Sequence, residues 1–282
     1  MYFLKKNKIL KESFDATRDV REKTLELISD STAGLTFEPE EHRYFLGNRE
    51  MRSVSSIVEH FAPFDKYGVA ERCSANPRHE MYGKSVEEII ALWEENGRTA
   101  AEEGTKVHAF GEACYLYLID REEEMEEEFR QRITPEGLEA RTPKEAALAT
   151  WWNDHDWKRF VPIAKETRIV NPALGYAGTF DLLLYDKYNF TLYDKDYKTN
   201  KDLDKWYGEM CIPPLSMIKA NDIGKYTIQQ TLYTIALRNL SLCIGANNLI
   251  WLKEDGYEER QLELGYDKVI EFAVRNYLNS LN

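Results

Sequence analysis

The sequence predicts an α/β protein in which helices flank a central mixed β-sheet. Three strand-like segments follow one another in the middle of the chain, at residues 161–170, 176–185 and 190–198. Segments with helical periodicity precede them, and a helix, two more strands and a closing helix follow. A chain with this order of elements buries its apolar surface by layering helices on a sheet.

The composition is that of a globular protein with an acidic excess. Of the 282 residues, 43% are hydrophobic and 12% aromatic, which is enough to bury a substantial core. The formal net charge of −12 argues against a protein that coats nucleic acid through bulk electrostatics. A nucleic-acid role would therefore need a local basic lining and metal ions.

Nothing in the sequence predicts export or membrane insertion. The first residues, MYFLKKNKILKE, contain lysines without a following apolar segment, and no apolar run is long enough to span a bilayer. We therefore expect a cytoplasmic protein that does not bind membranes. The cysteines lack the close spacing of a zinc site or a disulfide framework, and we expect free thiols at Cys73, Cys114, Cys211 and Cys243.

The first half of the chain is expected to be mainly helical, with one hairpin. Residues 1–35 read as a polar helical arm, and LTFEPEEHRYFLGNREMRSV alternates apolar and polar residues around Gly47-Asn48, as a hairpin does. Ser53 can cap a short helix that ends at Phe61. Helical periodicity returns over residues 85–118, and Pro143 opens a further helix over residues 142–157.

The second half contains the strands. The segments 176–185 and 190–198 are joined by Asp186-Lys187-Tyr188-Asn189, a suitable hairpin turn. A helix is expected over residues 223–240, and NNLIWLKEDGYEERQLELG predicts a second hairpin around Asp255-Gly256. An amphipathic helix over residues 266–281 closes the chain.

In the hairpin formed by residues 176–198, charged residues occupy positions where apolar residues would be expected. Side chains two residues apart in a strand share a face, so Asp196 and Lys198 point the same way. If the strands pair, Asp181 approaches Asp196, and a hard cation such as Mg²⁺ would neutralise the two carboxylates. Lys198 could then orient a metal-bound water beside a phosphate. The alternative is a surface hairpin whose acid and lysine are solvated.

Three further features add to this pattern, and each also has a plain structural explanation. Gly178 would allow another segment to approach the strand closely. EGTKVHAFGE places His108 and Glu112 four residues apart on one helix face, where they could simply form a surface contact. IQQTLYTIAL places Gln229 and Tyr233 at the same spacing, which would also suit a half-buried helix edge.

Together and in this order, these segments resemble the RecB-type branch of the PD-(D/E)XK nuclease superfamily, including its phage-encoded exonuclease members. The matching segments are GTKVH, GTFDLLL, DYKTNK and QTLY, which lie within residues 102–240. The resemblance implies a restriction-endonuclease-like core. We expect residues 96–282 to form this core, and residues 1–95 to form an N-terminal extension of helical arm, hairpin and helices packed on it.

The resemblance assigns roles to individual residues. Asp181 and Asp196 would bind Mg²⁺ or Mn²⁺ and take part in catalysis. The backbone carbonyl of Tyr197 would add an oxygen ligand, and His108 would be a further ligand. Lys198 would be the catalytic lysine.

Other residues would complete the catalytic set or contact DNA. Glu166, on the preceding strand, would be the upstream catalytic acid of the family. Gln229 and Tyr233 would contact the DNA strand near the scissile phosphate. Six basic residues near the site in sequence could form a local DNA groove: Lys195, Lys201, Lys205, Lys219, Lys225 and Arg238. Of these, Lys201, Lys205 and Arg238 are the expected DNA-binding residues. Trp206 and Tyr207 could stack on bases or belong to the core.

The sequence also departs from the family. No proline precedes Asp181, and Asp194 is an extra acid on the face of Asp196, so that the metal ligand could be either of them. Cys211 and Cys243 are isolated, and we expect no iron–sulfur cluster. There is no phosphate-binding loop of the helicase type.

The expected function is therefore a Mg²⁺- or Mn²⁺-dependent deoxyribonuclease, preferably an exonuclease on single-stranded DNA or duplex ends. A phage-encoded enzyme would act in the host cytoplasm and could have a recombination or replication protein as partner. Two alternatives remain at this point. The net charge and the glutamate-rich run at residues 122–128 would suit a non-catalytic acidic protein that mimics DNA. An RNA-directed nuclease would use the same metal chemistry.

Overall fold

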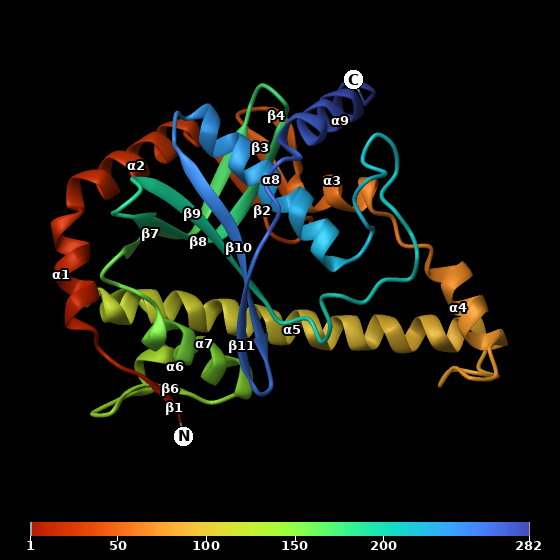
Figure 1. Ribbon diagram of the computed structural model, residues 1–282, viewed down its shortest axis with the longest axis horizontal. Coiled ribbons are helices and arrows are strands. Elements are labelled where there is room, and N and C mark those ends of the chain that lie inside the picture. The colour runs from red at the N-terminus through yellow and green to blue at the C-terminus, as the bar shows by residue number, and fades with distance from the viewer. Residues whose placement is uncertain (1, 282) are drawn as a thin grey trace.

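The computed structural model describes residues 2–281 and shows a twisted mixed sheet between two groups of helices (Figure 1). The sheet has the order β11-β10-β9-β8-β4-β3-β2, and β7 pairs with β8 outside this path. Its strands are β2 (Leu35–Glu38), β3 (Arg43–Leu46), β4 (Arg49–Ser53), β7 (Phe160–Asn171), β8 (Tyr176–Asp186), β9 (Thr191–Lys198), β10 (Ile244–Lys253) and β11 (Gly256–Gln261). The expected fold class is thus confirmed, with all three central strands and all three hairpins: β3–β4, β8–β9 and β10–β11.

Strand β8 organises the sheet because it pairs with three others. It is antiparallel to β7 along its whole length and to β9 over residues 182–186. It is parallel to β4 at residues 176 and 177. Since β9 and β10 are also parallel, the sheet is mixed. Pairing with β9 and with β4 leaves residues 178–181 of β8 without a strand partner on one edge.

One face of the sheet is covered by α5 (Val86–Leu118) and α7 (Pro143–Asp154), with α1 (Lys8–Ala16) beside them. Ser85 and Thr142 begin the two long helices with complete capping boxes, and Pro143 occupies the first turn of α7 as expected. A small sheet of three strands and two short helical turns lies next to α7 on this side: β1 (Tyr2–Leu4), β5 (Ile133–Thr134), β6 (Gly137–Ala140), η1 (Glu122–Glu124) and α6 (Glu127–Arg130).

The other face is covered by α3 (Val54–Phe61), α8 (Asp222–Asn239) and α9 (Asp267–Asn279), with α2 (Arg18–Ser31) at the side. Ser53 caps α3 as expected, and Asn221 caps α8. Two buried apolar clusters, one on each face, therefore hold the sheet between the helices (Figure 1).

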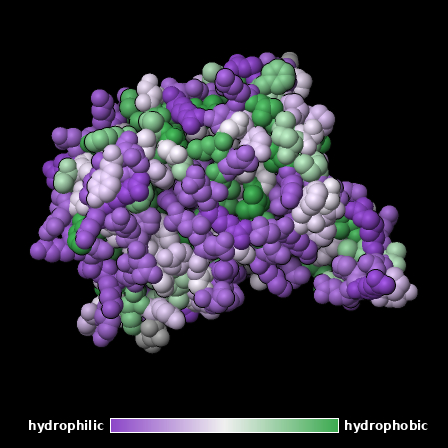
Figure 2. Space-filling model, viewed as in Figure 1, coloured by the Kyte–Doolittle hydropathy of each residue, from purple (hydrophilic) through white to green (hydrophobic). Residues whose placement is uncertain are grey.

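A projection that we name the arm, distinct from the helical arm expected at residues 1–35, extends away from this layered body. It consists of α4 (Lys66–Ala75) packed against the N-terminal part of α5, with a small apolar cluster of its own (Figures 1 and 2). The expected division after residue 95 falls within α5, and β4 of the expected extension belongs to the central sheet. The N-terminal segment and the core thus share one helix and one sheet. None of the described helices is long and apolar enough to span a bilayer.

Candidate metal and nucleic-acid site

Three carboxylates stand side by side on neighbouring strands. Lys165 pairs with Leu182 and Thr167 with Phe180, so Glu166 of β7 lies opposite Asp181 of β8. Because Leu182 pairs with Lys195 of β9, Asp196 comes next to Asp181 on the other side. The hairpin pairing expected from the turn at residues 186–189 therefore brings Asp181 and Asp196 together.

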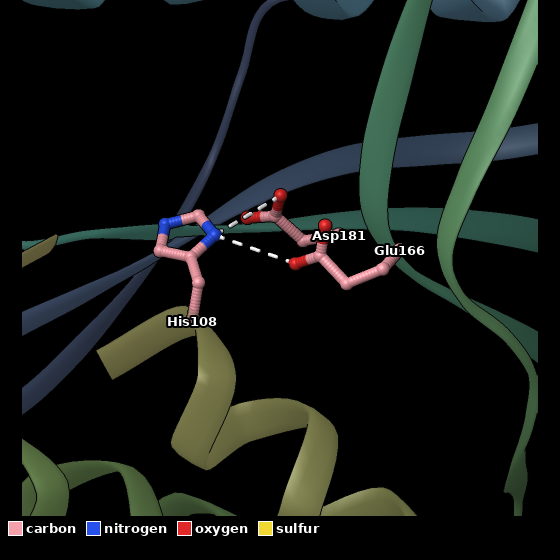
Figure 3. A group of neighbouring side chains, drawn as sticks. All are labelled: His108, Glu166 and Asp181. Atoms are coloured by element: carbon pink, nitrogen blue, oxygen red, sulfur yellow. Dashed lines mark ion pairs between the residues drawn. The ribbon is translucent and has the colours of Figure 1, made fainter. Parts of the chain in front are cut away.

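The strands are irregular at this row. Phe180 and Leu182 would share a face in a regular strand, yet Phe180 packs in the cluster under α8 and Leu182 in the cluster under α5. On β7, Glu166 has a φ of +40°, a left-handed conformation that few side chains adopt. Irregularities of this kind re-aim side chains next to functional sites. Here the carboxylates of Glu166 and Asp181 both point at His108 (Figure 3).

The Asp181 side chain replaces a missing ladder contact on the open edge of β8. One carboxylate oxygen accepts the backbone N–H of Tyr197 at 2.7 Å. Nearby, a Cβ at Gly178 would lie 2.7 Å from the ring of Tyr233 and 3.1 Å from Val54. Glycine is thus required for α8 to approach the strand, which confirms the close approach expected at this position.

His108 completes a group of three possible metal ligands. Its Nδ1 lies 3.4 Å from Asp181 Oδ1 and 3.5 Å from Glu166 Oε1, and one ligand atom from each of the three residues lies within 4.8 Å of the others. About 31% of the His108 side chain is exposed, so the group can be reached from solvent. Two carboxylates and an imidazole suit a divalent cation that takes oxygen and nitrogen ligands.

The proton affinities at the site show an excess of negative charge. Burial would lower the pKa of His108, but Asp181 and Glu166 outweigh it and raise this pKa to about 10. Burial would likewise raise the pKa of Asp181, but His108 and then Lys198 hold it at about 2. A group that attracts a proton this strongly will also attract a cation, so the residues fit a metal ion.

Asp196 and Lys198 form an ion pair beside this group. Burial raises the pKa of Asp196 to about 7, with Asp181 adding to the effect and Lys198 opposing it. Lys198 Nζ contacts an Asp196 carboxylate oxygen and lies 4.2 Å from the centre of the Tyr226 ring. Burial would lower the pKa of Lys198, but Asp196 raises it, so Lys198 remains an ammonium ion.

The other acids flagged by the sequence have different surroundings. Asp194 is fully buried, and in the described part of the chain neither of its carboxylate oxygens has a hydrogen-bond partner. Burial, followed by repulsion from Asp196, raises the pKa of Asp194 well above its usual range, which favours the neutral form of this carboxyl group. Glu112 forms an ion pair with Lys165 and lies outside the three-ligand group.

Gln229 and Tyr233 lie on the α8 side of the site. Gln229 Nε2 donates a hydrogen bond to Tyr233 Oη at 3.2 Å. Burial raises the pKa of Tyr233 well above its usual value, and Asp196 and Asp181 add to the shift. The two residues are thus brought together next to the carboxylates.

A cleft of about 1030 Å³ opens from His108 and Lys198 toward the turn between β10 and β11. Lys201, one of the basic residues expected near the site, lines this cleft, and Lys144 and Lys253 line it as well. Sequence spacing gave no sign of the last two, because α7 and the second hairpin meet α5 only in the folded chain. Acidic residues share the cleft, and Lys144 Nζ is 2.6 Å from Glu103.

The other two expected DNA-binding residues lie elsewhere. Arg238 is in the last turn of α8 and ion-pairs with Asp267 of α9. It follows Gln229 by nine residues, which is about 13 Å along a helix. Lys205 is in the exposed segment between β9 and α8, with Nζ 5.0 Å from the centre of the Tyr207 ring. The structure therefore brings Lys201 to the cleft, but not Arg238.

Comparison with known proteins finds structural likenesses at low sequence identity and no match to a family model or a curated protein. Among solved structures, the chain is similar to a "putative exonuclease" from Eubacterium rectale at 17% sequence identity and a TM-score of 0.44. The match covers 83% of this chain and 80% of the other.

Proposed function

We propose that this chain is a divalent-metal-dependent deoxyribonuclease of the RecB-type PD-(D/E)XK superfamily. The observation that carries the proposal is the row of Glu166, Asp181 and Asp196 across three strands, with His108 facing it and Lys198 ion-paired to Asp196. Carboxylates, an imidazole and a protonated lysine at the edge of a cleft form a suitable set for phosphodiester hydrolysis.

His108, Glu166 and Asp181 would hold the ion, with Asp196 and the Tyr197 carbonyl as further oxygen ligands. When bound there, a divalent cation would supply acidity to activate water and positive charge to offset a phosphate. Either Mg²⁺ or Mn²⁺ suits these ligands.

Lys198 would place a fixed positive charge next to the attacked phosphate. Its contact with Asp196 and its position over the Tyr226 ring restrict the flexible side chain, so that little reorganisation is needed when charge develops. Gln229 and Tyr233, joined by their hydrogen bond, would contact the DNA backbone from α8. Lys201, Lys144 and Lys253 would supply the local positive charge that the acidic chain lacks overall.

We favour an exonuclease that acts on DNA ends over an endonuclease. The cytoplasmic location, phage origin, and recombination or replication partner expected from the resemblance remain predictions. An RNA substrate also remains open, since the carboxylates and lysine act on a phosphate common to both nucleic acids.

The acidic-mimic alternative has less support. Four of the glutamates in the run at residues 122–128 have ion-pair partners within the fold, so their charge is partly neutralised. These pairs are Glu122 with Lys6, Glu124 with Arg121, Glu127 with Arg130, and Glu128 with Arg132.

The proposal is tested by digestion of end-labelled DNA with Mg²⁺ or Mn²⁺. Wild-type protein should release labelled product, and EDTA should stop the reaction. Asp196→Asn and Lys198→Ala should each lose at least about 100-fold in rate, as expected when a group that stabilises the transition state is removed. Glu254→Gln, an acid-to-amide change at the exposed rim of the cleft, is the matched control and should retain activity. Equal rates for the wild type and both site variants would overturn the proposal.

A further inference from the structure

A second surface, which we name the aromatic–lysine surface, lies on the arm and on the segment between β9 and α8. It exposes four large rings: Phe64 is 48% exposed, Tyr67 59%, Trp206 43% and Tyr207 51%. These rings belong neither to the group of His108, Glu166 and Asp181 nor to the apolar clusters on the two faces of the sheet. Trp206 and Tyr207 are therefore not core residues. So much exposed aromatic surface in two neighbouring segments needs an explanation.

The arm and the segment between β9 and α8 form one continuous surface. The ring of Phe64 lies 6.3 Å from that of Tyr207 and 6.1 Å from that of Trp93 on α5. Arg72 of α4 forms an ion pair with Glu209 at 3.2 Å. Residues from the two segments, far apart in the sequence, thus meet beside the arm.

Each of three exposed rings on this surface has a lysine ammonium above it. The distance from Nζ to the ring centre is 5.5 Å for Lys66 and Tyr67, 5.0 Å for Lys205 and Tyr207, and 4.8 Å for Lys219 and Trp206. Aromatic rings interleaved with cations provide stacking for bases and charge for phosphates, which is the combination that single-stranded nucleic acid requires.

The aromatic–lysine surface is connected to the candidate site at both ends of its loop. The segment begins directly after Lys198 and reaches the cleft through Lys201. It ends at Asn221, the cap of α8, and α8 carries Tyr226 and Gln229. A strand lying on the rings would therefore be led toward the lysine and the carboxylates.

We propose that the aromatic–lysine surface binds single-stranded DNA by base stacking and guides it to the cleft. The surface fits a single strand better than a duplex, because bases in a duplex are already stacked on each other and cannot cover protein rings. Acidic residues among the lysines, such as Glu94 beside Lys66, leave too little net charge for binding through phosphates alone. The inference rests on the proposed function for the chemistry in the cleft, but the binding itself can be tested without it.

The test is fluorescence anisotropy in EDTA, so that neither metal binding nor cleavage is needed. The probes are a labelled thymidine oligonucleotide of about 20 nucleotides, an abasic strand of the same length and charge, and a blunt duplex. Wild-type protein should bind the thymidine strand at least about 10-fold more tightly than the other two, because each stacked base contributes substantially to affinity.

Paired variants separate stacking from folding. Trp206→Ala with Tyr207→Ala should weaken thymidine binding by about 10- to 100-fold. Trp206→Phe with Tyr207→Phe keeps the rings and should stay within about 3-fold of wild type. Phe272→Ala removes an equally exposed ring from α9 and should bind as wild type does.

Equal binding of the abasic and thymidine strands, or full affinity in the double alanine variant, would overturn the inference. So would a uridine strand that binds more than about 10-fold better than DNA, because the occupant would then be RNA. If binding follows the prediction but DNA is not cut with Mn²⁺, the proposed nuclease function fails and the binding surface stands.

Discussion

Two histidines on the same side of the sheet show how their surroundings decide their chemistry. His108 on α5 faces two carboxylates, which raise its pKa to about 10. His155, after α7, is packed among the rings of Trp151, Trp157 and Phe160. Burial, followed by repulsion from Lys195, lowers the pKa of His155 to about 4. The pKa values of the two histidines are thus shifted in opposite directions, and only the surroundings of His108 attract a cation.

Two lysines of β9, Lys195 and Lys198, form ion pairs of different kinds. Lys195 and Lys198 are three residues apart and therefore point to opposite faces. Lys195 is buried and contacts Glu259, next to His155. Lys198 contacts Asp196 at the edge of the cleft. One strand thus supports a closed structural ion pair on one face and the candidate catalytic pair on the other.

The largest expected effect comes from removing the central carboxylate. Asp181→Asn should reduce DNA cleavage by at least about 1000-fold, since the change removes both a proposed metal ligand and the partner of His108. Asp181→Asn should also lower the pKa of His108 by at least one unit. NMR titration of the imidazole in the metal-free variant and wild type measures this change. An unchanged His108 pKa would contradict the assignment of that shift to Asp181.

The next effect separates the roles of the two histidines. His108→Ala should lose at least about 100-fold in cleavage rate while its melting temperature changes little. His155→Ala should lose about 1–3 kcal/mol of stability through the cavity among the rings, yet cleave DNA normally below its melting temperature. Thermal unfolding and cleavage rates of both variants test this, and a reversal of the two results would refute the comparison.

The pH dependence of stability should reveal the aromatic surroundings of His155. Its folded pKa of about 4 lies below the usual unfolded value of about 6.5, so the unfolded state binds the proton more readily. Full stability is therefore present above about pH 6.5 and falls as the pH drops toward 4, by about 1–3 kcal/mol from this residue.

Urea unfolding of the wild type and of His155→Phe at pH 7 and 4.5 isolates that contribution. The phenylalanine variant should lose less stability on acidification than the wild type, because it cannot take up the proton. The same loss in both proteins would mean that the acid sensitivity comes from other groups.

The smallest expected effect is on DNA affinity, when a lysine near His108 or near His155 is removed. Lys201→Ala, in the cleft near His108, should weaken DNA binding by a few fold and reduce the salt slope of the affinity by about one. Lys158→Ala removes an exposed lysine close to His155 and is the matched control, with no expected change in either quantity. DNA affinities of both variants, measured at several salt concentrations, test this difference. Equal salt slopes in the two variants would contradict a contact between Lys201 and DNA.

Much of the site could be predicted because it depends on local pairing. The turn at residues 186–189 sets the register of β8 and β9, and this register alone brings Asp181 next to Asp196. The position of Lys198 follows from strand alternation. His108 and Glu166 came from the resemblance, and the structure places both beside Asp181.

Other features depend on contacts between distant segments and left no pattern in the sequence. The left-handed conformation of Glu166 and the shift in alternation at Asp181 occur inside apparently regular strands. Lys144 and Lys253 reach the cleft only because α7 and the second hairpin pack near α5. Arg238 was expected near DNA from its closeness in sequence, but the length of α8 carries it to the far end.

Isothermal titration of Mn²⁺ into the metal-free protein tests whether His108, Glu166 and Asp181 hold a divalent cation. Wild-type protein and Asp194→Asn should both bind Mn²⁺ saturably, since Asp194 lies outside the three-ligand group. Asp181→Asn, the same change in a proposed ligand, should bind at least about 10-fold more weakly. Absence of binding by the wild type, or equal affinities in the two variants, would rule out a metal site at these three residues.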